Sequence, residues 1–192
     1  MKRKKTDTPM PPFRSPFPDD EWFPLVDETG RTVGKALRRE CHSGTKWLHP
    51  VVHLHVFNPA GELYLQKRPV HKDTQPGKWD TAVGGHVDYG ETVEKALWRE
   101  ALEELGLKDF QPVFVARYLF ESEREKELVN TFVTTCARPL HPNPDELDGG
   151  RFWTLEEIRQ NLARNVFTPN FEHEFQTFIA DSTRRCNSSL NH

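Results

Sequence analysis

Apolar residues gather in several short runs from residue 22 onward, and the run 49–57 is rich in β-branched residues, which is the pattern of short β-strands. Turn-forming residues separate these runs, for example at 27–30 and 58–61. The run 62–67 follows the second of these turns, so we expect it to pair with 49–57 as a hairpin. The predicted strands span residues 23–26, 33–37, 49–57, 62–67, 112–120, 128–137 and 150–153.

A helical period of about 3.6 residues is clear over 92–105 and is also present at 155–162 and 170–179. Thr92 is a suitable N-cap for the first of these helices, and Gly106 supplies the left-handed residue that commonly ends a helix. Strands on both sides of one strong helix predict an α/β sandwich of the α+β kind with a mixed central sheet.

The length of the chain, 192 residues, suits one domain with a substantial core, which we place at residues 21–180. Residues 1–20 contain five prolines and a basic cluster at 2–5, so we expect a disordered, Pro-rich leader. Residues 181–192 are polar and are predicted to form a flexible tail.

The overall charge excludes one large class of function. The formal net charge is −3 and the sequence pI is about 6.3, whereas a general nucleic-acid binder normally carries a basic excess. The sequence has no apolar run of roughly 20 residues, the length needed to cross a bilayer. Three scattered cysteines, Cys41, Cys136 and Cys186, predict reduced thiols. We therefore expect a cytoplasmic protein with no nucleic-acid and no membrane partner.

The candidate chemistry lies on the predicted helix 92–105. Glu100, Glu103 and Glu104 are spaced i, i+3, i+4, which places them within an arc of roughly 100° on the helix. A solvated acidic face is the usual interpretation of such a run. Here, however, one carboxylate is directed toward the apolar side, where it requires a balancing cation. Oxygen-rich sites of this kind suit Mg²⁺ or Mn²⁺.

A longer pattern includes this helix. It consists of Gly85, five residues, Glu91, seven residues, and then Arg99-Glu100-Ala101-x-Glu103-Glu104-x-Gly106-Leu107. This pattern resembles the Nudix box, with Ala101 at a position where a larger aliphatic residue is common. The resemblance implies a Nudix-like α/β/α sandwich and metal-dependent cleavage of a diphosphate linkage by water.

The same resemblance implies a role for each residue of the box. Glu100, Glu103, Glu104 and the Gly85 carbonyl would hold the divalent metal. Glu91 would pair with Arg99 and brace the loop against the helix. Either Glu103 or Glu104 would act as general base.

A second pattern begins upstream at His42 and His49, continues through Gln66-Lys67-Arg68 and Lys72, and ends at His86. It resembles isopentenyl-diphosphate isomerase, an enzyme that shares the Nudix fold. The resemblance implies a second metal site and basic residues on the substrate diphosphate. The matching metal ligands are His42, His49, His86, Glu125 and Glu127, and the matching diphosphate-binding residues are Arg68 and Lys72. The isomerase needs a cysteine two residues before its third histidine, where this chain has Gly84.

Three hypotheses follow from these patterns. The leading one is a hydrolase of a nucleoside diphosphate derivative or a similar small organic diphosphate. The second is an isomerase like isopentenyl-diphosphate isomerase, and the third is a non-catalytic diphosphate-binding module. Residues 138–150 and the final helices are open to two interpretations, as part of the substrate pocket or of a homodimer interface. His53 and His55 share one face of a predicted strand, and we expect a hydrogen-bonded pair there rather than a metal site.

Overall fold

The computed structural model of the chain describes residues 21–72 and 74–180. The expectations for the leader at 1–20 and the tail at 181–192 lie outside these residues. No helix among the described residues is long and apolar enough to span a membrane.

Most of the secondary structure follows the predicted pattern. The strands are β1 (Trp22–Val26), β2 (Thr32–Leu37), β3 (Leu48–Phe57), β4 (Leu63–Lys67), β5 (Trp79–Asp80), β6 (Val83–His86), β7 (Val113–Glu121), β8 (Lys126–Thr135) and β9 (Gly150–Trp153). The helices are α1 (Arg38–Cys41), α2 (Val93–Leu105), α3 (Leu155–Asn161) and α4 (Pro169–Glu174), which continues into a π-helical turn (Phe175–Ile179). The short elements α1, β5 and β6 were not predicted.

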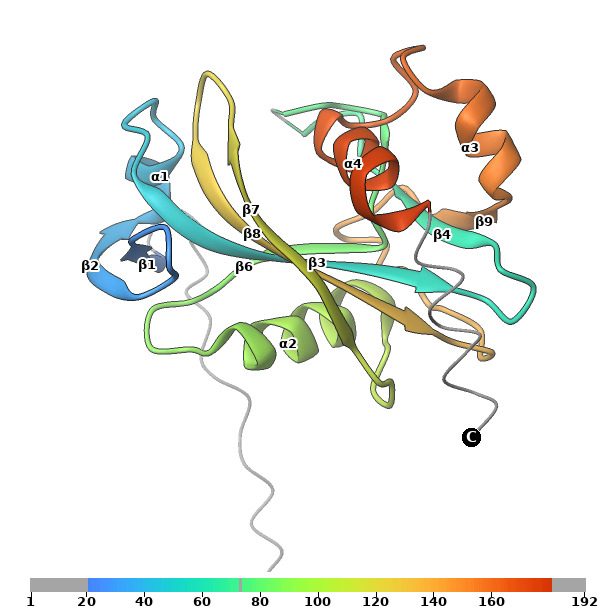
Figure 1. Cartoon of the computed structure of the whole chain (residues 1–192), viewed down its shortest axis with the longest axis horizontal. Coiled ribbons are helices and arrows are strands. Elements are labelled where there is room, and N and C mark those ends of the chain that lie inside the picture. The colour runs from blue at the N-terminus through green and yellow to red at the C-terminus, as the bar shows by residue number, and fades with distance from the viewer. Residues whose placement is uncertain (1–20, 73, 181–192) are drawn as a thin grey trace, which may run out of the picture.

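The central sheet is mixed, as expected. Its main path has the order β5-β4-β3-β8-β7, with β6 paired to β3 and β9 paired to β4. β3 runs parallel to β8 along its whole length and antiparallel to β4 and β6. β1 and β2 form a separate antiparallel ribbon. Figure 1 shows α2 against one face of the large sheet and α3 and α4 over the other, which is an α/β/α sandwich.

β3 is the centre of the fold because helices cover both of its faces, and it is buried along nearly its whole length. One core, on the α2 side, includes Val52, Leu54, Val56, Leu97 and Ala101. The other, under α3 and α4, includes Phe57, Leu65, Ile158, Phe171 and Phe175. Burial of each large apolar side chain contributes roughly 1.5–3 kcal/mol, so these cores fix the position of β3 between the helices.

Helix α2 begins and ends where the sequence predicts. The Thr92 side chain accepts a hydrogen bond from the Lys95 backbone N–H at 3.3 Å, and Gly106 adopts φ +63° after the last turn. The buried residues of α2 include Glu100 and Glu104 beside Leu97, Ala101 and Leu105. The apolar face of α2 therefore carries two carboxyl groups toward β6.

Candidate active site

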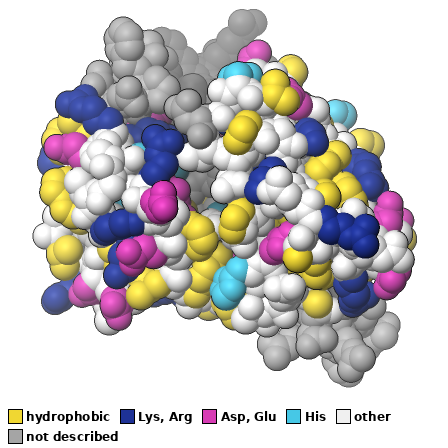
Figure 2. Space-filling view, turned by 90° about the horizontal axis from the view of Figure 1, so that it is seen from above, with side chains coloured by type: hydrophobic (Ala, Val, Ile, Leu, Met, Phe, Trp, Pro, Cys, Tyr) yellow, Lys and Arg dark blue, Asp and Glu magenta, His cyan; other side chains and the backbone are white. Residues whose placement is uncertain are grey.

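A cavity of about 990 Å³ contains most of the residues singled out from the sequence. Of the predicted site residues, those that line it are Gly85, Glu100, Glu104, His42, His86, Glu125, Glu127, Arg68 and Lys72. On the face shown in Figure 2, Lys and Arg side chains are interspersed with Asp and Glu side chains. The described residues of that face therefore form no uniformly basic surface.

Arg99 and Glu91 are brought together beside the cavity. The Arg99 guanidinium donates to both carboxylate oxygens of Glu91, at 3.0 Å and 2.9 Å, and to the backbone carbonyl of His86 at 2.8 Å. These bonds connect the turn before α2 to the second half of α2 and to the end of β6. Such a bidentate pair has both geometric specificity and strength, so Arg99 and Glu91 hold the loop against the helix.

Gly85 is required by the position of Glu100. A Cβ atom added at Gly85 would overlap the side chain of Glu100, including its carboxyl group. The Glu100 carboxyl therefore lies directly on the backbone of β6, where only a glycine leaves space for it. The same carboxyl accepts a hydrogen bond from Arg99 Nη1 at 2.5 Å.

Glu104 is the second buried carboxyl group of α2. Its Oε2 accepts a hydrogen bond from the Gly84 backbone N–H at 3.1 Å, and only 6% of the residue is exposed. Burial and then the nearby charge of Glu100 raise the pKa of Glu104 well above its ordinary value. The carboxylate form is therefore costly here unless a cation lies beside it, which is the environment expected of a metal ligand.

Glu103 differs from its two neighbours. It is not among the residues that line the cavity, and its Oε2 lies 3.5 Å from Arg99 Nη1. Glu100, Glu103 and Glu104 do not form a metal-ligand cluster among the described residues, where such a cluster requires one ligand atom from each residue within 4.8 Å of the others. The three carboxyl groups therefore do not meet at one point in these side-chain positions, and their joint role as metal ligands stays a prediction. The physical reason is Arg99 Nη1, which contacts both the Glu100 and the Glu103 carboxylates as a cation.

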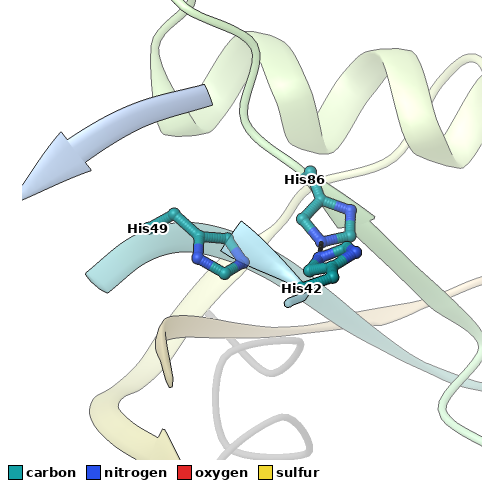
Figure 3. Close-up of side chains that lie close together, drawn as sticks. All are labelled: His42, His49 and His86. Atoms are coloured by element: carbon teal, nitrogen blue, oxygen red, sulfur yellow. Dashed lines mark hydrogen bonds between the residues drawn. The ribbon is translucent and has the colours of Figure 1, made fainter. Parts of the chain in front are cut away.

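The three histidines suggested by the isomerase resemblance do form a cluster. Their ligand nitrogens all lie within 4.8 Å of one another, although they come from the end of α1 (His42), from β3 (His49) and from β6 (His86). Figure 3 shows the rings close together, with a hydrogen bond of 3.0 Å between the Nε2 atoms of His42 and His86.

His49 gives this cluster the character of a metal site. Its Nδ1 lies 2.9 Å from the carbonyl oxygen of Trp47, to which it donates as Nδ1–H. Its Nε2 is buried and has no hydrogen-bond partner among the described residues. A backbone carbonyl that fixes the tautomer and leaves the other nitrogen lone pair unused is the usual arrangement of a histidine ligand.

Glu125 and Glu127 complete a set of nitrogen and oxygen donors around His49. One ligand atom from each of these three residues lies within 4.8 Å of the others, and Glu125 also lies 3.3 Å from His42 Nε2. The parallel register of β3 and β8 places His49 beside Glu127. The residues present therefore fit a divalent ion that accepts both imidazole and carboxylate ligands.

The electrostatics of the cluster support the same conclusion. Burial and the charge of Arg38 lower the pKa of His42 to about 4. Burial is also the largest cause that lowers the pKa of His49 and of His86, so the imidazoles are neutral near pH 7. Burial and the charge of Glu125 raise the pKa of Glu127 to about 8. A bound cation would stabilise the ionised form of Glu127.

Arg68 and Lys72 both reach the wall of the cavity, but they differ in how firmly they are held. Arg68 donates to Asp80 at 3.0 Å and, from the other side of its guanidinium, to the Thr74 carbonyl. Asp80 in turn accepts a 2.6 Å bond from the Thr168 hydroxyl. Lys72 is exposed. Asp80 was missed from the sequence because it lies in a two-residue strand with no detectable period.

His53 and His55 form the hydrogen-bonded pair expected from the sequence, and their shared partner is Glu174 of α4. Glu174 was missed, although a signal was present. It stands at helical spacing between the apolar residues Phe171 and Phe178, and a lone acid on an apolar face needs buried partners.

Similarity to known proteins agrees with this geometry. A family model described as NUDIX domain matches residues 47–173. Isopentenyl-diphosphate Delta-isomerase of Mycolicibacterium vanbaalenii is 33% identical over 132 residues, which cover 64% of this chain and 71% of that protein. A protein of Pseudomonas aeruginosa named uncharacterized Nudix hydrolase PA4841 is 33% identical over 151 residues, with coverage of 76% and 82%.

Solved structures show the same fold. DR0079 from Deinococcus radiodurans has a TM-score of 0.66 and 26% identity, over 86% of this chain and 99% of that one. A MutT protein from Methanosarcina mazei Go1 has a TM-score of 0.59 and 22% identity, over 76% and 96% of the two chains. The chain therefore belongs to the Nudix family, and its relatives include proteins named as hydrolases and proteins named as isomerases.

Proposed function

We propose that the protein is a metal-dependent hydrolase of a small organic diphosphate, such as a nucleoside diphosphate derivative. The observation that carries this proposal is the contact between α2 and β6 at the cavity, where Glu100 lies on Gly85 and Glu104 binds the Gly84 N–H. Two carboxyl groups and a strand backbone with no side chains between them provide oxygen ligands on one wall of the cavity.

In this proposal Glu100, Glu104 and the Gly85 carbonyl hold Mg²⁺ or Mn²⁺, with Glu103 as a further ligand that must turn from Arg99. When bound, the cation would neutralise diphosphate charge and lower the pKa of a water molecule. Arg99 and Glu91 hold the loop before α2 against the helix. Arg68 and Lys72 contact the diphosphate, Lys72 through its exposed ammonium and Arg68 through donors not already bound to Asp80 and Thr74.

The reaction joins a water oxygen to phosphorus and breaks the bond between that phosphorus and the bridging oxygen, which takes the electron pair. The water proton passes to a carboxylate acting as general base. Of the two candidates, Glu104 is supported because it lines the cavity, whereas Glu103 does not. A cation beside Glu104 favours its ionised form, which is the form that accepts a proton.

The histidine and glutamate cluster is proposed as a second metal site of the same cavity. Its three imidazole nitrogens suit Mn²⁺ or another transition metal better than Mg²⁺. A small-molecule substrate rather than a nucleic acid agrees with the mixed charge of the face in Figure 2. We also propose the cytoplasm as the location, in keeping with the free buried thiols of Cys41 and Cys136. The homodimer stays a prediction from the sequence.

One observation favours a second candidate function. The cluster of His42, His49, His86, Glu125 and Glu127 matches the donor set implied by the isomerase resemblance, and two relatives named as isomerases are 33% and 28% identical to this chain. Gly84 counts against isomerisation, because no thiol is present at the position where the isomerase uses one on carbon.

A single experiment separates these functions. The purified protein is incubated in ¹⁸O-labelled water, with Mg²⁺ or with Mn²⁺, and with nucleotide sugars, dinucleoside polyphosphates, ADP-ribose, NADH, coenzyme A and isoprenoid diphosphates. The proposal expects cleavage of at least one diphosphate with one labelled oxygen in a phosphoryl product. Conversion of isopentenyl diphosphate to its dimethylallyl isomer without label would establish the second function. Tight binding without turnover of any compound would favour the non-catalytic module.

A further inference from the structure

We infer that His53 is a substrate-contacting residue, and that its Nε2–H donates a hydrogen bond to the diphosphate beside Gly84 while the buried Glu174 orients the ring. This inference rests on the proposed function, because it identifies a further group that acts on the same diphosphate. The ligand class is an anionic phosphoryl group.

The position of His53 provides the first argument. His53 lies on β3 directly opposite Gly84 of β6, and it lines the cavity with about a tenth of its side chain exposed, 10%. A Cβ atom at Gly84 would lie 3.6 Å from His53 Cδ2 and 3.7 Å from Nε2. This edge of the ring therefore faces the space over Gly84, which is next to the Gly85 and Glu104 wall of the proposed metal site.

The opposite edge of the ring is fixed. His53 Nδ1 lies 3.0 Å from Glu174 Oε1, and the same oxygen accepts bonds from Thr131 Oγ1 at 2.6 Å and from the Tyr118 hydroxyl at 3.1 Å. His55 Nε2 lies 2.7 Å from the other oxygen, Oε2. Glu174 is fully buried, so these four donors hold one orientation of the carboxylate and, through it, of the His53 ring.

The charge state of the pair leaves a donor in the cavity. Burial alone would raise the pKa of Glu174, but the charges of His53 and His55 and their hydrogen bonds lower it below its ordinary range. Burial would lower the pKa of His53, but the charge and hydrogen bond of Glu174 raise it to about 9. Asp80 and Glu127 act in the same direction from the surrounding elements. A protonated imidazole donates from both nitrogens, so Nε2–H remains for a ligand when Nδ1–H is bound to Glu174.

A purely structural role would make His53 equivalent to His55, yet the two differ in one respect. His55 makes a bond of similar length to the same carboxylate, but its side chain is 0% exposed and it is not among the residues that line the cavity. His53 alone of the pair lines the cavity, and its Nε2 edge lies over Gly84, which has no side chain.

This position suits the chemistry of diphosphate cleavage. When the phosphorus–oxygen bond breaks, the bridging oxygen gains the electron pair and its negative charge increases. An N–H group fixed beside that oxygen stabilises the charge, and no proton needs to be transferred, so the step requires no reactant besides water. Loss of one such donor typically lowers kcat by about 10²–10³-fold.

The test compares two matched variants. His53→Asn places an amide N–H near the former Nδ1, so it can keep the bond to Glu174 while it removes the donor in the cavity. His55→Gln keeps the bond that His55 makes through Nε2 and changes nothing in the cavity. We expect His53→Asn to lower kcat by about 10²–10³-fold and His55→Gln, which keeps its bond to Glu174, to lower kcat far less. The wild-type rate should fall as the pH rises through the pKa of His53, and the asparagine variant should lack this fall.

A binding measurement keeps the inference separate from the proposed hydrolysis. Titration of each protein with methylenediphosphonate, which cannot be hydrolysed at its bridge, should show weaker binding for His53→Asn than for His55→Gln. Equal binding and equal turnover of the two variants would overturn the contact while leaving hydrolysis intact. If the wild type shows no turnover but its binding of methylenediphosphonate still depends on His53, the proposed hydrolysis is overturned and the contact between His53 and the diphosphate is not. If His53→Asn does not fold, Gly84→Ala takes its place, because its Cβ narrows the space over Nε2 at ordinary contact distance. Unchanged binding by that variant would also overturn the contact.

Discussion

The ring of Phe23 is stacked on the ring of His86, with centroids 4.5 Å apart and planes 6° from parallel. Phe23 also stacks on His49 at 5.6 Å and is itself fully buried. Phe23 belongs to β1 of the small ribbon, which precedes the residues that the family model matches. The ribbon therefore forms one wall of the histidine cluster and contributes to the low dielectric that keeps its imidazoles neutral.

The stacking of Phe23 predicts a combined loss of stability and of metal affinity. Phe23→Ala should destabilise the fold by about 3–5 kcal/mol, the usual cost of removing the side chain of a buried phenylalanine. It should also weaken Mn²⁺ binding, because the substitution exposes the histidine side chains to water. Chemical denaturation and calorimetric titration measure the two effects. Trp22→Ala is the control, because Trp22 is next to Phe23 but is 44% exposed. Equal effects of the two substitutions would contradict the account.

The buried Nε2 of His49, which has no hydrogen-bond partner among the described residues, predicts that a substitution of His49 lowers the affinity for the metal. His49→Ala should lower the affinity of the cluster for Mn²⁺ by at least about 100-fold, since loss of even an outer partner of a ligand costs about 10–100-fold. Calorimetric titration and the metal content of the purified protein check this. His71→Ala is the control, because His71 is an exposed histidine outside the cluster. Unchanged Mn²⁺ affinity in His49→Ala would show that the histidine cluster is not a metal site.

The close approach of Glu100 to Gly85 predicts that this glycine tolerates no side chain. Gly85→Ala should displace the Glu100 carboxyl, lower turnover of any diphosphate substrate by about two orders of magnitude, and cost about 1–3 kcal/mol in unfolding free energy from overpacking. Gly34→Ala is the control, because a Cβ there meets only Leu25 at 3.8 Å or more. Wild-type activity and stability in Gly85→Ala would show that the contact does not position Glu100.

The Glu174 network predicts the direction of a pH effect on stability. The pKa of His53 is raised from 6.5 to about 9 in the folded protein. Its pairing with Glu174 therefore contributes fully below about pH 6.5 and is lost as the pH rises through about 9. Glu174→Gln should be less stable than the wild type by about 3–5 kcal/mol near pH 6, because it leaves a buried imidazolium unpaired.

The measurement for this prediction is the difference in unfolding free energy between wild type and Glu174→Gln, determined from pH 6 to pH 10. Taking the difference removes the contributions of other carboxyl groups with raised pKa values, such as Glu127. The difference should shrink as the pH rises. A difference that is constant or that grows over this range would show that the pair is not ionised as described.

The sequence predicted the framework of the site well because the framework depends on backbone pattern. Thr92 and Gly106 mark the ends of α2, and the run of apolar and β-branched residues in 49–57 marks the central strand. The stretch Gly84-Gly85-His86 is not among the strands predicted from the sequence, because glycine is depleted in strands. It becomes strand β6 because β3 lies beside it and α2 covers it.

Side-chain directions were harder to predict than positions. The spacing of Glu100, Glu103 and Glu104 places them on one face, but it does not say that Arg99 lies between two of them. Likewise, Glu174 lies 121 residues from its partner His53, and no local pattern links them. Contacts of this kind depend on which strands become neighbours in the folded chain.

The most direct test of the central claim is the rate of Mg²⁺- or Mn²⁺-dependent diphosphate hydrolysis by Glu104→Gln, compared with the wild type and with Glu94→Gln. Glu94 is on the same helix but is exposed and does not line the cavity. Glu104→Gln should lose at least about a hundredfold in kcat, as expected for a lost catalytic base, while it stays folded. Glu94→Gln should keep the wild-type rate. Hydrolysis by Glu104→Gln at the wild-type rate would contradict the assignment of the α2 carboxylates as the catalytic centre.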